Sequence, residues 1–251
     1  MNSPATDQPW SDGLPPHVKL ALEELIAAAQ KSFGANLRSV VMFGSGAEGR
    51  LRATSDVNLL IILKRFEQVQ ADPFRDPLRV AHAAARASVM FVLETELAAA
   101  SEAFAVKFSD IARRHRVLCG DNLLSQLESS RAAKIQRLKQ VVLNTLLRLR
   151  ERYALVSLRE QQLALTIADM AGPLRAAAAT LLELEGKKIT SSREALEFIA
   201  QEHGNKNWQA ALELVSQARE SRSLPSGKAA EVMFALMELC DHLRQRLNRL
   251  A

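Results

Sequence analysis

Residues 38–64 read RSVVMFGSGAEGRLRATSDVNLLIILK, in which two apolar runs flank a polar loop. The first run, residues 39–43, stops at Gly44, and the second, residues 57–63, starts directly after Asp56. Apolar runs of this length that are bounded by glycine and polar residues are typical of buried strands. The stretch therefore predicts a strand, a tight polar loop and a second strand.

Four residues of this stretch are suited to phosphate and metal binding. Gly44 lets backbone N–H groups approach a phosphate closely, and the Ser45 hydroxyl adds one more donor. Side chains two positions apart on a strand point the same way, so Asp56 and Asn58 share one face of the second strand. A carboxylate and an amide oxygen are both ligands for a hard cation.

This pattern resembles the motif of the nucleotidyltransferase superfamily, which has the polymerase-beta-like fold. There, a strand ends in Gly-Ser, and Ser-Asp-x-Asp opens the next strand. The resemblance implies that Gly44 and Ser45 bind the phosphates of ATP or another nucleoside triphosphate, that Asp56 is a ligand of Mg²⁺, and that Asp56 and residue 58 are catalytic. In active relatives three carboxylates hold two Mg²⁺ ions, which clamp the attacking and leaving oxygens. Asn58 departs from the pattern, because a neutral amide is a poor bridge between two divalent ions.

The third carboxylate of the motif should lie on a later strand, which we expect at residues 103–109. In the alignment with relatives the acidic position falls on Lys107, while Asp110 and Glu94 are the alternatives. With Lys107 at that position, one of three metal-binding carboxylates remains and a cation replaces another. The sequence thus predicts a nucleotidyltransferase fold whose metal-dependent transfer is weakened or absent.

The composition is that of a globular chain with a mild excess of positive charge. The 251 residues are 48% hydrophobic and 24% charged, and 33 basic against 28 acidic side chains give a net charge of +5. This charge permits an anionic partner without requiring one. Aromatic residues make up 5% of the chain, too few for a surface that stacks RNA bases. The composition thus argues against a nucleic acid as the partner, and the resemblance implies a nucleotide instead.

Targeting and redox signals favour a cytoplasmic protein that does not enter a membrane. The N-terminal residues lack the basic and apolar segments of a secretory signal. No apolar stretch reaches the roughly 18 residues that cross a bilayer. Cys119 and Cys240 are far apart and outside metal-ligand spacing, so we expect two reduced thiols.

Residues 15–121 are expected to form the nucleotidyltransferase-like domain, a small mixed β-sheet with flanking helices, after a disordered tail of residues 1–14. Proline, glycine and apolar periodicity set its expected elements. These are a helix at 15–33 that Gly34 ends, a loop with Pro73 and Pro77, a helix at 78–87 that contains His82, a strand at 89–93, and a basic helical turn at 111–116.

Residues 122–251 are expected to form a helical bundle of about five helices, so that the chain as a whole has an α+β fold. A long amphipathic helix spans residues 135–153, and its second face is basic. Capping boxes at Ser157 and Ser191 should open two helices. Asp169 lies just before Gly172-Pro173 in an Ala-rich helix. A buried carboxylate there is either a general base for an acceptor hydroxyl or a partner of backbone groups that a proline kink frees.

A nucleotidyltransferase sheet followed by a helical bundle resembles the aminoglycoside nucleotidyltransferases and a broad group of bacterial nucleotidyltransferase-domain proteins. Three functions stay open on this resemblance. The first is nucleotide binding with little or no transfer. The second is transfer of AMP from ATP to a hydroxyl of a small molecule or protein. The third is a non-catalytic, antitoxin-like interaction module.

Overall fold

The computed structural model describes residues 9–52, 54–125, 127 and 129–250 of the chain. The chain divides into two compact units. We call the first, residues 1–101 and 111–128, the sheet unit, and the second, residues 102–110 and 129–251, the helical unit. The short segment 102–110 belongs to the helical unit although it precedes the last strand, so the chain passes between the units more than once.

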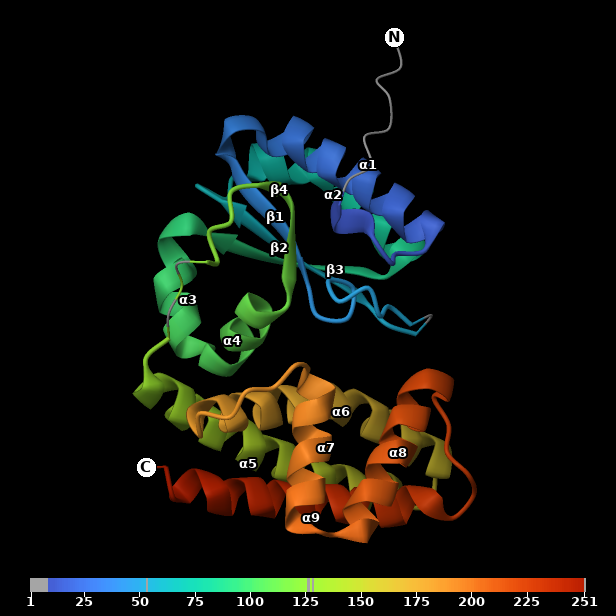
Figure 1. The fold of residues 1–251 in the computed structure, drawn as a ribbon. Helices are drawn as coiled ribbons and strands as arrows, with labels where there is room; N and C mark the ends of the chain where they lie inside the picture. The colour runs from blue at the N-terminus through green and yellow to red at the C-terminus, as the bar shows by residue number, and fades with distance from the viewer. Residues whose placement is uncertain (1–8, 53, 126, 128, 251) are drawn as a thin grey trace. The chain divides into compact units, whose positions relative to one another are not determined.

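Within the described residues, the sheet unit contains a mixed four-stranded sheet in the order β3-β2-β1-β4 (Figure 1). β1 pairs antiparallel with β2 and with β4, whereas β2 and β3 run parallel. The strands are β1 (Leu37–Phe43), β2 (Val57–Leu63), β3 (Ala87–Leu93) and β4 (His115–Gly120). A small mixed sheet with flanking helices was predicted from the sequence, and the α+β fold class is confirmed.

Helices α1 (Pro16–Phe33) and α2 (Gln68–Ala85) pack on one face of this sheet (Figure 1). Alternate strand residues such as Val40 and Leu59 point to that face and join the apolar side of α1 in one core. Leu60, on the opposite face of β2, is also fully buried. Because both faces are covered, β2 reads as a continuous apolar run and not as an alternating one.

Helix α2 includes Pro73 and Pro77, which we expected in a loop before a helix at 78–87. Proline removes one N–H donor from a helix. Pro73 is exposed and Pro77 is half-buried, and the two lie four residues apart on one side of the helix, so the carbonyl groups left unpaired can reach water. His82 lies on this helix and is exposed, with its Nδ1 3.0 Å from the Ala87 carbonyl oxygen.

The prediction of a strand at residues 103–109 is wrong. Most of this segment is helical, in α3 (Leu97–Ala103) and α4 (Ala105–Arg113). The fourth strand, β4, begins only at His115. Three of the buried apolar side chains of α4 lie at three-residue spacing, namely Ala105, Phe108 and Ile111, and Val106 is buried beside them. A helical period was thus read as a strand, because the segment is short and apolar.

The basic residues at 111–116 do not form one helical turn, as the sequence predicted, but divide between the end of α4 and the start of β4. Arg114 forms an ion pair with Glu48, with Nη1 and Oε2 3.2 Å apart. Arg116 binds backbone groups of the N-terminal segment. Both arginines therefore hold parts of the sheet unit together.

Residues 9–14 differ from the disordered tail that we expected at residues 1–14. Pro9–Ser11 form a short 3₁₀ helix. Trp10 is 7% exposed and packs in the core of the sheet unit. Nη1 of Arg116 donates hydrogen bonds to the carbonyl oxygens of Trp10 and Asp12, at 3.1 and 2.7 Å. Residues 1–8 lie outside the described residues.

Within the described residues, the helical unit contains the five helices α5–α9 (Figure 1), as the sequence predicted. Their apolar faces form one core. The helices are α5 (Arg131–Val156), α6 (Glu160–Leu184), α7 (Ser192–His203), α8 (Lys206–Ser221) and α9 (Lys228–Asn248). No helix in the described part of the chain is long and apolar enough to cross a membrane.

Of the two serines predicted to open helices through capping boxes, Ser191 forms the N-cap of its helix. The Ser191 hydroxyl accepts a hydrogen bond from the Glu194 N–H at 3.2 Å and caps α7. The prediction of a capping box at Ser157 is wrong, because Ser157 is the C-cap of α5. α6 begins three residues later, at Glu160. The carboxylate of Glu160 instead accepts a hydrogen bond from the Gly227 N–H at 2.5 Å.

Asp169 is exposed, which contradicts the buried carboxylate that we expected. Its Oδ1 lies 3.0 Å from Nη1 of Arg222 in an ion pair, and α6 continues through Pro173. Asp169 therefore acts as a surface partner of Arg222. Both roles that we expected for Asp169, a general base in an apolar pocket and a partner of freed backbone groups, are therefore wrong.

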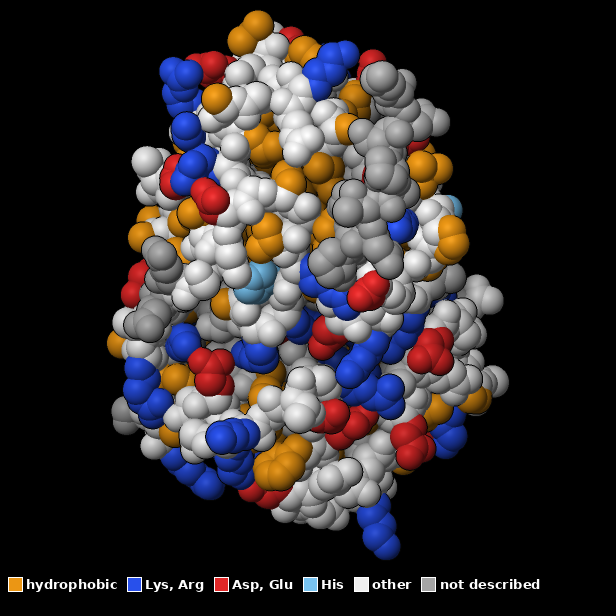
Figure 2. All heavy atoms as spheres, turned by 45° about the horizontal axis from the view of Figure 1, so that its top comes forward, with side chains coloured by type: hydrophobic (Ala, Val, Ile, Leu, Met, Phe, Trp, Pro, Cys, Tyr) orange, Lys and Arg blue, Asp and Glu red, His pale blue; other side chains and the backbone are white. Residues whose placement is uncertain are grey.

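The basic face of α5 is partly neutralised within the helical unit. Lys134 Nζ lies 2.6 Å from Oε1 of Glu183, and Arg150 Nη2 lies 3.8 Å from Oδ2 of Asp241. Figure 2 shows basic and acidic side chains intermixed on the face that it draws. Interspersed charges of this kind are typical of a solvated surface.

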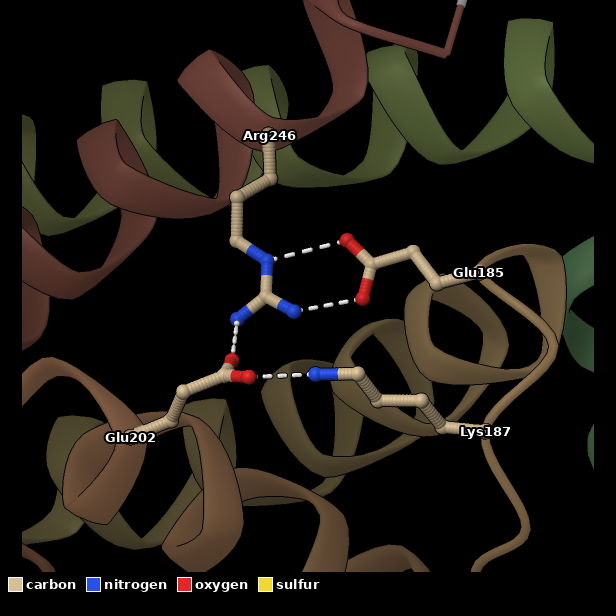
Figure 3. Close-up of polar contacts among 4 residues, drawn as sticks. All are labelled: Glu185, Lys187, Glu202 and Arg246. Carbon is tan, nitrogen blue, oxygen red and sulfur yellow. Dashed lines mark hydrogen bonds and ion pairs between the residues drawn. The ribbon is translucent and has the colours of Figure 1, made fainter.

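Four charged side chains join α9 to α7 and to the segment after α6 (Figure 3). Arg246 donates from Nε and Nη2 to the two carboxylate oxygens of Glu185, at 2.9 and 2.5 Å, and from Nη1 to Glu202 at 2.7 Å. Lys187 donates to the other oxygen of Glu202. Burial of Arg246 disfavours its charged form, but the hydrogen bonds and negative charges of Glu185 and Glu202 together outweigh this, so the pKa of Arg246 is raised.

We expect Glu185→Gln to lower the free energy of unfolding by about 2 kcal/mol, because a largely buried guanidinium loses the carboxylate that binds it through two hydrogen bonds and keeps only its contact with Glu202. The side chains of Arg246 and Glu185 are 11% and 16% exposed. Urea denaturation at neutral pH measures the change. The control is Glu231→Gln, which breaks an exposed pair with Lys228 and should cost less than about 0.5 kcal/mol. Equal losses in the two variants would contradict the argument from burial.

The pH dependence of stability tests Glu202 separately. The hydrogen bond from Lys187 holds the pKa of Glu202 below its ordinary value of 4.5. A carboxyl group with a lowered folded pKa stabilises the fold above its unfolded pKa, and the contribution is lost as pH falls through the folded pKa. The wild type should therefore be more stable than Glu202→Gln at neutral pH, and this difference should disappear at acid pH. We expect a difference below about 1 kcal/mol, because the Glu202 side chain is 42% exposed. Urea denaturation of both proteins, from neutral pH to below pH 4.5, measures this difference in stability. A difference that acid leaves unchanged would contradict the prediction.

Candidate functional site

The antiparallel pairing of β1 and β2 brings the two halves of the sequence motif together. Phe43 pairs with Asn58, so Gly44 follows β1 at the point where β2 begins. A Cβ atom added to Gly44 would lie 3.9 Å from Nδ2 of Asn58. Asp56 directly precedes β2. The predicted residues Gly44, Ser45, Asp56 and Asn58 thus share one edge of the sheet.

Gly44 has a backbone conformation that other residues rarely adopt, with φ of +75°. This conformation turns the chain sharply at the end of β1. The N–H group of Gly44 donates to the carbonyl oxygen of Arg114 at 3.1 Å. Gly44 therefore shapes the loop, while its own N–H is already engaged.

The residues after Gly44 form a helix-like turn with free backbone donors. The carbonyl oxygen of Gly44 accepts from the Glu48 N–H at 3.2 Å, and that of Ser45 accepts from the Arg50 N–H at 2.9 Å. The N–H groups of residues 45–47 donate to no acceptor in the part of the chain that the structure describes. Successive free N–H groups in a turn form a concave site for an anion.

Asp56 is paired with Arg86, a residue that the sequence analysis missed. Nε and Nη2 of Arg86 each lie 2.9 Å from Oδ1 of Asp56. Arg86 ends α2 in the left-handed conformation, with φ of 52°, and its carbonyl oxygen accepts from the Val57 N–H at 3.2 Å. One signal could have found it. In a β-α-β unit with parallel strands, the residue before the second strand lies beside the residue before the first.

Lys107 and Asp110, two candidates for the third metal ligand, lie on helix α4 and belong to the helical unit. Lys107 is exposed. Asp110 is 8% exposed and accepts a hydrogen bond from the Ser192 hydroxyl at 3.0 Å. Neither residue lies on a strand beside Asp56, as we expected for the third ligand, because the segment is helical.

Glu94, the remaining candidate, lies at the other end of the sheet. β2 and β3 are parallel and paired from Val57↔Ala87 to Leu63↔Leu93. Asp56 precedes the first pair and Glu94 follows the last, so the length of a strand, roughly 20 Å, separates them. Glu94 is instead paired with Arg38, with Nε and Oε2 3.0 Å apart.

The strand register also identifies the positions where further carboxylates would have to lie. Asn58 is flanked by Ser88 on β3 and Phe43 on β1, and Phe43 in turn pairs with His115 on β4. None of these side chains is acidic. Within the described residues, no group of three or more His, Cys, Asp or Glu side chains could hold a metal ion. Because Mg²⁺ needs several oxygen ligands, with carboxylates to balance its charge, the residues present do not fit a two-metal centre.

A hollow of about 600 Å³ on the sheet unit lies away from this site. Asn36, Lys64 and Arg65 line it, at the start of β1 and the end of β2. Leu37 pairs with Leu63 at that edge, whereas Gly44 lies at the opposite one. The hollow therefore does not belong to the candidate site.

No protein-family model and no curated protein sequence matches the chain. The chain is similar in structure to spectinomycin adenyltransferase AAD(9) from Enterococcus faecialis, solved with ATP and spectinomycin. The TM-score is 0.64 at 12% sequence identity, and the match covers 92% of this chain and 99% of that one. Similarity at this identity concerns the fold and not the activity. It confirms the predicted nucleotidyltransferase fold followed by a helical region.

We expect Gly44→Ala to lower the free energy of unfolding by about 1–2 kcal/mol, because a Cβ atom strains a backbone with positive φ. Steric contact adds little, since the nearest atom would be 3.9 Å away. Gly172→Ala is the control. Gly172 lies within α6 with no atom within 4 Å of an added Cβ, so alanine there should be neutral or stabilising by up to about 1 kcal/mol. Urea denaturation of both variants measures the difference, and equal changes would contradict the backbone argument.

Proposed function

We propose that this protein binds a nucleoside triphosphate at the loop after β1, and that its metal-dependent nucleotidyl transfer is weakened or absent. One observation carries the proposal. Free backbone donors at residues 45–47 lie at the same sheet edge as Asp56, whose carboxylate is already paired with Arg86. Such an edge is suited to hold phosphates and poorly suited to hold two metal ions.

Phosphate binding rests on the turn that Gly44 starts. The N–H groups of residues 45–47 and the Ser45 hydroxyl are the proposed donors; Ser45 is half-buried, whereas Gly46 and Ala47 are buried. Glycine is favoured at position 44 because a residue without a Cβ atom adopts this positive φ at no steric cost. In this proposal Gly44 and Ser45 form the nucleotide-binding part of the site.

Weak transfer rests on the charge at the two positions that are catalytic in the superfamily. Nucleotidyl transfer needs cations that neutralise the phosphates and clamp the attacking and leaving oxygens. Asp56 offers one carboxylate toward Mg²⁺, and Asn58 offers a neutral amide whose Nδ2 lies 3.4 Å from the Asp56 carbonyl oxygen. The two residues together lack the charge to hold a pair of divalent ions.

A second candidate is active transfer of AMP from ATP to a hydroxyl of a small molecule or a protein. The observation that favours it is the extent of the fold similarity, which includes 92% of this chain and 99% of an adenyltransferase solved with ATP and spectinomycin. The two candidates share the nucleotide site and differ in turnover.

Two measurements on the full chain separate them. Isothermal titration calorimetry with ATP, GTP, CTP and UTP measures binding, and release of pyrophosphate with Mg²⁺ or Mn²⁺, with and without cell extract, measures transfer. We expect at least one nucleotide to bind and little pyrophosphate to form. Sustained pyrophosphate release by the wild type would establish the second candidate. A chain that binds none of the four nucleotides would contradict both.

We expect Asn58→Asp to raise Mg²⁺-dependent pyrophosphate release by roughly tenfold or more, because it restores the second carboxylate of the motif. Adding Ser88→Asp places a further carboxylate beside residue 58 in the strand register and should raise it again. The matched control is Asn207→Asp, the same chemical change at an exposed position of α8. If the control matched the effect of Asn58→Asp, a change of net charge and not of metal binding would explain the result.

A further inference from the structure

The disagreement between the site and its expected metal has a specific cause in Arg86. A guanidinium already neutralises the one carboxylate that the motif retains, with two nitrogens 2.9 Å from the same oxygen of Asp56. A divalent ion at Asp56 would have to displace this cation or lie beside it. The positions next to Asn58 in the sheet add no carboxylate that could compensate.

We propose that Arg86 is a built-in cation that takes over the charge-neutralising part of the metal's role, so that the site binds a nucleoside triphosphate in its metal-free form. The inference rests on the proposed function and names the ionic form of its ligand. Free ATP carries two more negative charges than its Mg²⁺ complex. A site with a fixed guanidinium and one paired carboxylate favours the more negative form.

Arg86 has donors to spare for a phosphate. A guanidinium has five N–H donors in a planar fork. Nε and Nη2 contact Asp56, while Nη1 has no partner in the part of the chain that the structure describes. The side chain is 58% exposed, so a ligand at the sheet edge can reach it.

The backbone holds Arg86 at the sheet edge before any ligand arrives. Its N–H donates to the His82 carbonyl oxygen at 2.8 Å, and its carbonyl oxygen accepts from the Val57 N–H at 3.2 Å. These bonds link the end of α2 to the start of β2. Asp56, directly before β2, then orients the guanidinium. A cation fixed in this way loses little conformational entropy on binding a phosphate.

Calorimetric titration of the full chain with ATP tests the ionic form directly. In EDTA we expect ATP to bind, and in a large excess of Mg²⁺ we expect the apparent affinity to be equal or weaker. Binding that requires Mg²⁺ would overturn the inference and leave the proposed function intact. Absence of binding under both conditions would contradict the proposed function, and the inference with it.

Substitution of Arg86 tests the residue. Arg86→Asn removes the charge, and asparagine tolerates the left-handed conformation that Arg86 adopts, so the fold should be kept. We expect ATP affinity in EDTA to fall by about tenfold, the loss of one charge-assisted hydrogen bond. Arg86→Lys retains a cation and should recover part of the affinity.

The chain offers a closely matched control in Arg222. It also ends a helix in the left-handed conformation, with φ of 57°, and it also pairs with a single aspartate oxygen, Oδ1 of Asp169 at 3.0 Å. Arg222→Asn should leave ATP affinity unchanged. If it weakened ATP binding as much as Arg86→Asn, the effect would come from net charge, and the assignment to Arg86 would be overturned.

Asp56→Asn separates an orienting partner from a metal ligand. It frees Arg86 and removes a negative charge from the phosphate site, so we expect ATP affinity in EDTA to be retained or raised. The contrary result would be seen with Mg²⁺ present: the wild type binds ATP, and Asp56→Asn does not, although the variant binds ATP in EDTA. That result would identify Asp56 as a metal ligand and overturn the inference.

Discussion

The pairing of β1 with β2 is the constraint on which the rest of the sheet unit depends. Phe43 opposite Asn58 puts the end of one strand beside the beginning of the next. Every feature of the candidate site follows from this register: the turn at Gly44, the carboxylate of Asp56 and the amide of Asn58 all lie at one edge. A slip of one residue would reverse the faces of β2 and expose its buried side chains, so burial of the apolar run fixes the site geometry.

The electrostatics of that edge differ from those of a metal centre. A metal centre concentrates negative charge and offsets it with ions from solution. Here a single carboxylate is offset by a guanidinium from the end of α2. The carbonyl oxygen of Arg86 accepts a hydrogen bond from the Val57 N–H, which links α2 to β2. Arg86 therefore contributes to the fold through its backbone and to the charge of the site through its side chain.

The helical unit has one apolar core, and two groups of polar contacts lie at its helix ends. Arg246 ties α9 to the ends of α6 and α7, and Asp110 receives the Ser192 hydroxyl at the start of α7 (Figure 3 shows the first of these groups). Apolar periodicity determines which side of a helix is buried but not which helix ends meet. The acidic residues that looked available for chemistry, Asp169 and Asp110, are used in these contacts.

The sequence alone determined the α+β class, the first two strands and the five helices of the second half, because long apolar runs and regular periodicity are local signals. It also determined the loss of a carboxylate at Asn58. It misplaced the fourth strand, because a short apolar segment such as residues 103–109 fits both periods. Only the tertiary structure decided that Arg86 meets Asp56 and that Glu94 does not. These contacts join residues far apart in the chain, and their positions depend on the strand order and on the direction in which β3 runs, neither of which is encoded in any one segment.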